Sequence, residues 1–333
     1  MKKEVLVIVP QFWAEAVLQQ SIGKKSVTLR RFGWSDESLE AATTHAQIRL
    51  EEAGKQLALG SKTALREPKK AYNGADGVPI REEILGRLED AVLTRNLYGA
   101  VCLNTPNVLF ADVDVDIEGG AGPSLAFYIG VDAILVVFGV VLCSILLPKL
   151  WAIGFLLAVV GPMVTKPIYK MHKGNRPDPR EAGLDRIRHF SAEHPAWNLR
   201  IYETPAGWRI LAMHKTFNPN YAEVFAFFQE VGADPVYVRM CKNQNCFRAR
   251  VSPKPWRIGI SQHIRPRPGV WPIAENRLPE RARWVEQYDL LAPQFASCRF
   301  TEAIGSSTVS PEAEQVRFLH DKLCQSDSML PLA

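Results

Sequence analysis

The sequence has few cysteines, and they are widely scattered. Its 333 residues contain six, from Cys102 to Cys324. Without repeated close pairs, free thiols are expected rather than a disulfide framework. Cys241 and Cys246 form one loose pair, but a structural zinc site needs about four ligands and no second pair follows. A disulfide-stapled or zinc-finger domain is therefore not predicted.

The chain also has little excess charge and no internal repeat. The 40 Lys and Arg residues nearly balance the 35 Asp and Glu residues, for a formal net charge of +5. An excess this small does not by itself indicate a nucleic-acid-binding protein. The opening MKKEVLVIVP contains an apolar run too short for a signal peptide, and it favours a first strand instead.

Two long apolar runs stand out in this otherwise polar chain. They cover Leu125–Leu147 and Leu150–Thr165, and Asp132 is the sole charged residue inside them. As a helix the first run would extend about 34 Å, enough for a hydrocarbon core of roughly 30 Å. The sequence therefore predicts a transmembrane helical hairpin over residues 124–168. The alternative is a helical hairpin buried within a protein core.

Basic residues after the second run predict the orientation of this hairpin. Positive charge favours the cytoplasmic side, so both termini are expected to be cytoplasmic and the protein to lie in the inner (plasma) membrane. The basic flank would also attract the anionic headgroups of the lipid bilayer. Residues 1–118 and 178–333 are then the two parts of one cytoplasmic α+β domain that holds the inserted hairpin. Asp132 is expected at the membrane interface, or paired with Lys166.

Local patterns indicate strands and helices along both polar segments. Helix caps, turn residues and alternating apolar positions are the signals used. Ser310 and Pro311, for example, are typical of a helix start. The expected strands are 5–10, 26–32, 101–103, 108–117, 199–204, 208–214, 237–241 and 247–252, and the expected helices are 35–58, 80–96, 184–193, 221–231 and 311–324.

Three acids alternate along one predicted strand. Asp112, Asp114 and Asp116 follow the apolar segment VLFA, so their carboxylates share one face of the strand. Like charges this close repel one another unless a cation neutralises them. A divalent ion, Mg²⁺ or Mn²⁺, bound with phosphate oxygens would supply that charge. Alternatively, the acids lie on an exposed strand edge and discourage aggregation.

Basic residues later in the chain are candidates to bind a phosphate ligand. Arg209 and His214 follow the turn of a predicted hairpin, and Arg248, Arg250 and Lys254 follow or lie on another strand. Such a row suits a polyanion such as a nucleotide or nucleic acid. Alternatively, Arg209 pairs with Glu203 across its own turn, His214 simply ends a strand, and the remaining cations form a solvated edge.

The order of these residues resembles the archaeo-eukaryotic primase-like nucleotidyltransferases. An acidic pair on a strand (Asp112, Asp114), a later strand ending in His214 and a further acid, Asp234, carry the resemblance, which covers four short segments. It implies that the three acids hold a divalent metal ion for catalysis. It also implies that His214 contacts the phosphate of a nucleotide.

Two functions from different classes follow from this sequence. In the first, a membrane protein binds a divalent metal ion and a nucleotide or other phosphate ligand, and it catalyses nucleotidyl or phosphoryl transfer. In the second, the same domain is a non-catalytic, membrane-tethered interaction module, whose acids pair with its own basic residues. Convergence of Asp112, Asp114, His214 and Arg248 in one cleft would favour the first.

Overall fold

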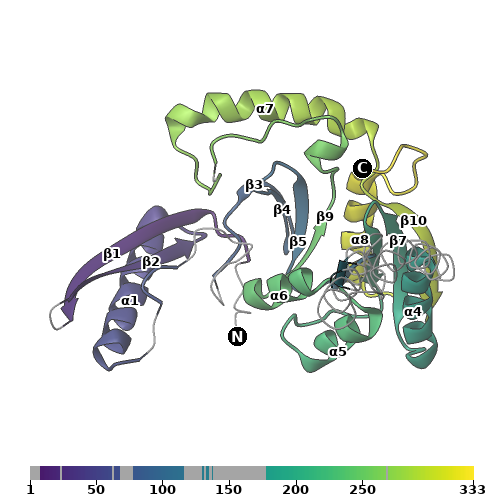
Figure 1. Cartoon of the computed structure of the whole chain (residues 1–333), viewed down its shortest axis with the longest axis horizontal. Helices are drawn as coiled ribbons and strands as arrows, with labels where there is room; N and C mark the ends of the chain where they lie inside the picture. Colours follow the sequence, from purple (N-terminus) through teal and green to yellow (C-terminus); the bar gives the residue numbers. More distant parts are fainter. Residues whose placement is uncertain are drawn as a thin grey trace, which may run out of the picture. The chain divides into compact units, whose positions relative to one another are not determined.

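The computed structural model describes residues 8–22, 25–61, 64–67, 78–115, 178–267 and 269–333, together with Gly130, Ala133, Ile134 and Val137. The chain divides into two compact units. One comprises Met1–Asp114 and Arg186–Ala333, and the other comprises Val115–Asp185. The first unit contains the described strands and the candidate site, and its elements are labelled in Figure 1. Its class is α+β.

The N-terminal part of this unit is a two-stranded antiparallel hairpin covered by one helix. Ser38 caps the helix by accepting a hydrogen bond from the backbone N–H of Ala41. Gly33 lies directly beneath the helix, where a Cβ would collide with the backbone of Ala42 and Ala46. The elements are β1 (Phe12–Ile22), β2 (Lys25–Ser35) and α1 (Leu39–Ala58).

The remaining strands, β3 to β10, form two four-stranded antiparallel sheets. The first has the order β10-β7-β8-β6, with β10 (Arg299–Gly305), β7 (Asn198–Thr204), β8 (Gly207–Ala212) and β6 (Phe110–Asp114). The second has the order β3-β4-β5-β9, with β3 (Glu83–Leu88), β4 (Ala91–Arg95), β5 (Val101–Thr105) and β9 (Phe247–Arg250). Strands β6 and β9 are thus the end strands of their sheets, and they contact each other.

Helices pack on these sheets, and two of them contact the region where β6 and β9 meet. The start of α6 is fixed on β6, because the Tyr237 hydroxyl donates to the Phe110 carbonyl and the Asp234 N–H donates to the Asp112 carbonyl. Trp284 of α7 packs on the segment that follows β9. The helices are α4 (Pro179–Glu193), α5 (Ala222–Val231), α6 (Pro235–Gln244), α7 (Leu278–Leu291) and α8 (Pro311–Cys324).

Several predicted elements are confirmed. The hairpin of β7 and β8, the helices α5 and α8, and the strands β2, β5, β6 and β9 lie where local patterns placed them, within a few residues. Ser310 caps α8 through a hydrogen bond from the Ala313 N–H, as its sequence indicated. Strand β1, helix α7 and strand β10 were not expected. The strand expected over 5–10 is not present in its described part, residues 8–10.

Two predicted elements have the wrong type. The helix expected over 80–96 is the hairpin of β3 and β4, turning at Glu89 with a positive φ of 50°. Because β4 lies between two neighbouring strands and is buried along most of its length, its residues lack the polar alternation of a half-exposed strand. The strand expected over 237–241 belongs to α6, which Asp234 caps and Pro235 begins.

The predicted transmembrane hairpin over 124–168 is corrected. Within the residues that the structure describes, no helix is long and apolar enough to cross a membrane. The 20-residue α1 carries Glu51, Glu52 and Lys55, and the other described helices of 10 to 15 residues extend only about 15–23 Å. Apart from four residues, 124–168 lies outside the described residues, as does Asp132. The predictions of an inner-membrane location, cytoplasmic termini and a membrane tether are withdrawn with the hairpin.

Candidate functional site

A pocket opens where β6 and β9, the end strands of the two sheets, meet. It has a volume of about 320 Å³, and both sheets and α6 contribute to its walls. Seven of the residues that the sequence singled out line it: Asp112, Asp114, Arg209, Asp234, Arg248, Arg250 and Lys254. The fold therefore gathers acids and cations from segments more than 100 residues apart.

An ion pair between neighbouring strands lines the pocket and joins a buried arginine to a partly exposed aspartate. Asp112 of β6 stands opposite Arg209 of β8 in the register. The Arg209 Nε donates to one carboxylate oxygen at 2.7 Å and its Nη2 donates to the other at 3.2 Å. Although burial alone would lower the pKa of Arg209, the Asp112 carboxylate raises it. Arg209 thus pairs with Asp112 rather than with Glu203, and its charge is permanent.

The Arg209 side chain also ties the two sheets together. Its Nη1 donates to the carbonyl of Arg250 on β9 at 2.8 Å, and the same nitrogen lies 3.5 Å from His320 Nε2. Only 2% of the Arg209 side chain is exposed, so its guanidinium fixes the orientation of the Asp112 carboxylate from the buried side. Arg209 is therefore a positioning residue for Asp112.

A second buried ion pair holds Arg248. Its Nη2 donates to Glu82 at 2.6 Å, and the two side chains are 6% and 4% exposed. The same Glu82 oxygen accepts a hydrogen bond from the Thr94 hydroxyl. Because this carboxylate compensates the charge of Arg248, the side chain anchors the wall of the pocket and is less available to a ligand than a free cation would be.

The other two acids differ in how they are bound. Partial burial raises the pKa of the Asp114 carboxyl, and repulsion from Asp112 and Asp234 adds to the rise, although the Asp114 residue is exposed at the pocket. The Asp234 carboxylate caps α6, accepting hydrogen bonds from the N–H groups of Val236 and Tyr237. Asp114 is thus the acid whose charge is least compensated, whereas Asp234 already has backbone partners.

Three cations lie at and after the end of β9, and two of them, Arg250 and Lys254, line the pocket. Among the described residues Arg250, Lys254 and Arg257 form no ion pair with a carboxylate, and Nη1 of Arg257 is buried without a hydrogen-bond partner. Burial and the neighbouring guanidinium groups lower the pKa of Lys254 and of Arg257, while Asp114 acts in the opposite direction on both. Such mutual repulsion leaves this cluster, the cation group, in need of an anion.

One predicted site residue does not join the pocket, and another lies outside the described residues. His214 lies beyond the end of β8, where its ring is 4.7 Å from the ring of Trp197 and 5.3 Å from that of Phe217. Burial lowers its pKa, followed by the charge of Lys215. The predicted convergence thus holds for Asp112, Asp114 and Arg248 but not for His214. Asp116 lies outside the described residues.

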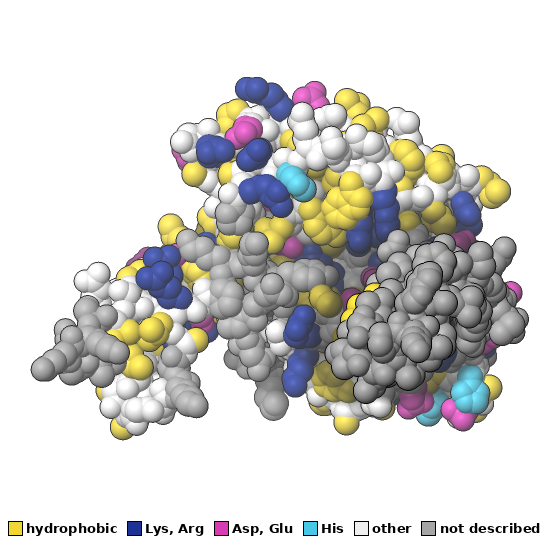
Figure 2. Space-filling view, viewed as in Figure 1, with side chains coloured by type: hydrophobic (Ala, Val, Ile, Leu, Met, Phe, Trp, Pro, Cys, Tyr) yellow, Lys and Arg dark blue, Asp and Glu magenta, His cyan; other side chains and the backbone are white. Residues whose placement is uncertain are grey.

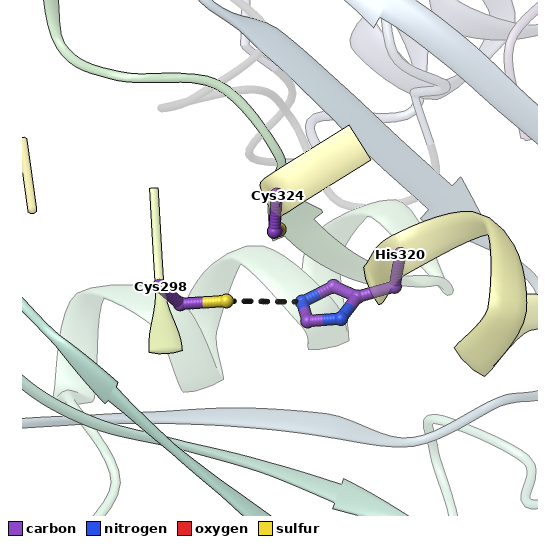
Figure 3. Close-up of side chains that lie close together, drawn as sticks. All are labelled: Cys298, His320 and Cys324. Carbon is purple, nitrogen blue, oxygen red and sulfur yellow. Dashed lines mark hydrogen bonds between the residues drawn. The ribbon is translucent and has the colours of Figure 1, made fainter. Parts of the chain in front are cut away.

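A buried group of Cys298, His320 and Cys324 can bind a metal ion (Figure 3). One ligand atom from each residue lies within 4.8 Å of the others, and the Cys298 Sγ is 3.8 Å from His320 Nε2. Asp321 accepts a hydrogen bond from Nδ1 of His320, which turns Nε2 toward the sulfurs. Sulfur and imidazole donors suit a soft ion such as Zn²⁺ rather than Mg²⁺.

Sequence reasoning missed this group and the glutamate that pairs with Arg248. His320 and Cys324 are four residues apart on a correctly predicted helix, so they share a face, and that spacing was an available signal. No local signal linked them to Cys298, or Glu82 to Arg248, 166 positions away. In comparisons with protein-family models, curated proteins and solved structures, nothing matches this chain.

Proposed function

We propose that the pocket binds a divalent cation, Mg²⁺ or Mn²⁺, together with a phosphate ester such as a nucleotide. One observation carries this proposal. Arg250 and Lys254 of the cation group line the same pocket as Asp112 and Asp114, yet the cation group has no carboxylate partner among the described residues. A metal–phosphate ligand presents positive charge to the acids and negative charge to the cations, and so neutralises both groups.

The acids supply enough oxygen ligands for such a cation. Mg²⁺ in proteins is commonly held by one or two carboxylates and completes its shell with water and substrate phosphates. Among the described residues the Asp114 carboxylate has no hydrogen-bond or ion-pair partner, and each Asp112 oxygen keeps a lone pair after accepting from Arg209. The raised pKa of Asp114 means that a cation beside it would relieve repulsion.

The cations supply the phosphate contacts. Arg250 and Arg257 offer planar guanidinium donors, which match phosphate oxygens, and Lys254 adds a compact charge. The buried, unpartnered Nη1 of Arg257 is a donor that a phosphate oxygen could satisfy. The resemblance to primase-like nucleotidyltransferases stays a prediction, and binding of metal and nucleotide is the part of it that the pocket supports.

Calorimetric titration of the full chain tests the proposal. We expect Mn²⁺ and ATP to bind together more tightly than either alone, because each compensates charge for the other. Asp114→Asn should abolish the gain in ATP affinity that Mn²⁺ gives. Lys254→Ala should weaken ATP binding about tenfold, which corresponds to a loss of about 1.4 kcal/mol in binding free energy.

Matched substitutions outside the pocket provide the controls. Asp327→Asn and Lys322→Ala remove the same charges from exposed positions, and they should leave binding unchanged. If Asp114→Asn binds Mn²⁺ and ATP as well as the wild type does, or if the wild type binds neither, the metal–phosphate site is refuted. The acids and cations would then serve a non-catalytic interaction surface, for which the paired carboxylate of Asp112 is already suited.

A further inference from the structure

We infer that the ligand of this pocket carries a nucleobase, which stacks on an aromatic pair formed by Trp256 and Tyr98 beside the cation group. The inference rests on the proposed phosphate site and adds the chemical class of the group attached to the phosphate.

The two rings form a pair beside the pocket. Their centroids are 5.3 Å apart with an interplanar angle of 59°, and Tyr98 lines the pocket itself. Trp256 remains 54% exposed. Because Trp is highly buried on average, this exposed indole is a surface on which a flat ligand group can stack. Figure 2 shows other exposed hydrophobic side chains lying next to Lys and Arg side chains on the face in view.

The indole is held on the same turn as two of the cations. Trp256 is the middle residue of a short 3-10 helix, η3 (Pro255–Arg257), with Lys254 immediately before it. The Arg257 N–H donates to the Lys254 carbonyl at 2.9 Å, and Pro255 is buried beneath the turn. The Lys254 Nζ lies 5.5 Å from the Trp256 ring centroid. A phosphate on these cations would therefore have its attached group near the indole.

The turn that carries Tyr98 is also fixed. It joins β4 to β5, and Asn96 Oδ1 accepts hydrogen bonds from the N–H groups of Tyr98 and Ala100. Gly99 adopts a positive φ of 100°, which closes the turn beside Tyr98. The aromatic pair is therefore largely formed before a ligand arrives, so little conformational entropy is lost when a flat ring stacks on it.

A nucleotide uses both parts of this site, because its phosphate binds the cation group and its flat base stacks on the aromatic pair. Stacking of a base on an aromatic side chain contributes about 1–3 kcal/mol and tolerates any base. A simple inorganic phosphate would satisfy the cations and leave the indole exposed. The same chemistry is present in a free nucleotide and at the phosphorylated end of a nucleic-acid strand.

Competition between ligands with and without a base tests the inference on the full chain. With Mg²⁺ present, ATP should bind at least about tenfold more tightly than inorganic tripolyphosphate, which offers a similar phosphate chain without a base. Trp256→Leu should remove this preference while tripolyphosphate affinity stays unchanged. Trp256→Phe, which keeps an aromatic face, should retain most of it. Phe318→Leu, at an exposed aromatic on α8, is the matched control and should have no effect.

The outcomes separate this inference from the proposal beneath it. Equal affinity for ATP and tripolyphosphate would overturn the base platform and leave the phosphate site standing. Failure of both to bind would remove the phosphate site. A third titration uses a single-stranded oligonucleotide that carries a 5′-triphosphate. It shows whether the base that stacks on Trp256 belongs to a free nucleotide or to the end of a nucleic-acid strand. Binding that is weakened by Trp256→Leu supports stacking, and tighter binding than ATP assigns the base to a strand end. If the Trp256→Leu variant still prefers ATP to tripolyphosphate, stacking of the base on Trp256 is refuted.

Discussion

Buried charge at single residues determines much of this pocket's stability. Arg248 and Glu82 are almost fully buried and paired at 2.6 Å. Arg248→Met leaves the Glu82 carboxylate buried without its counter-charge, so we expect a loss of about 3–5 kcal/mol in the free energy of unfolding. Urea denaturation followed by far-UV circular dichroism measures it. The double variant Glu82→Gln/Arg248→Met should recover most of the loss, and an unchanged midpoint for Arg248→Met would contradict this account.

A second prediction at residue scale concerns the pH dependence of Asp114. Its folded-state pKa is raised, so the folded state binds this proton more tightly than the unfolded state does. Stability from Asp114 is therefore greatest below the ordinary value of 3.8 and declines as pH rises through the raised pKa. At pH 7, without metal, Asp114→Asn should raise the Tm by about 1–2 °C.

Thermal melts at several pH values measure whether the Tm difference between Asp114→Asn and wild type has the expected sign. The difference between Asp114→Asn and wild type should shrink as the pH falls below 3.8, where the carboxyl becomes protonated in both states. Saturating Mn²⁺ should reverse it, because only the wild type gains stability from the ion. A variant that is less stable than wild type at pH 7 without metal would show that Asp114 has a structural partner.

At the scale of elements, the cap of α6 connects helix formation to the site. The Asp234 carboxylate satisfies two N–H groups of the first turn, and the Asp234 backbone N–H holds Asp112. Asp234→Ala should cost about 1 kcal/mol of stability, whereas Asp234→Asn should keep the cap and cost little. We expect Asp234→Asn to bind Mn²⁺ nearly as well as wild type. A complete loss of Mn²⁺ binding would instead make Asp234 a metal ligand.

Helix α8 supplies two candidate ligands of the buried cysteine–histidine group, and Cys298, just before β10, supplies the third. Added Co²⁺ should produce a thiolate-to-cobalt charge-transfer absorption, because Nε2 of His320 already faces the sulfurs. Cys298→Ala and Cys324→Ala should abolish it. Cys246→Ala, at a buried thiol outside the group, should retain it. If all three variants show the same absorption, the thiols of Cys298 and Cys324 do not bind the ion. The group would then be ordinary core packing.

For the molecule as a whole, the pocket joins two sheets. Its walls come from β6 and β8 of one sheet and from β5 and β9 of the other. A bound ligand should therefore protect both sheets from opening. Hydrogen exchange with Mn²⁺ and ATP present should slow in β6, α6 and β9 together, while α1, which packs on β1 and β2, serves as the internal control. Slowing restricted to one sheet would contradict a ligand that bridges both.

The sequence by itself determined the features that depend on neighbours along the chain. The cap of α8 at Ser310, the turn between β7 and β8, and the shared face of Asp112 and Asp114 all follow from contacts within a few residues. The same local reasoning misassigned β3 and β4 as a helix. It also took two apolar runs as membrane spans, whereas no described helix is able to cross a membrane.

Only the tertiary structure decided which charges meet. The register of β6 against β8 pairs Asp112 with Arg209, and the approach of β9 brings Arg250 and Lys254 to the pocket that the acids line. Glu82 reaches Arg248 across 166 positions, and Cys298 meets His320 across 22. These partners depend on strand order and packing, which local propensities do not encode. The candidate residues could thus be named from the sequence, but their partners, and with them the chemistry of the site, depended on the fold.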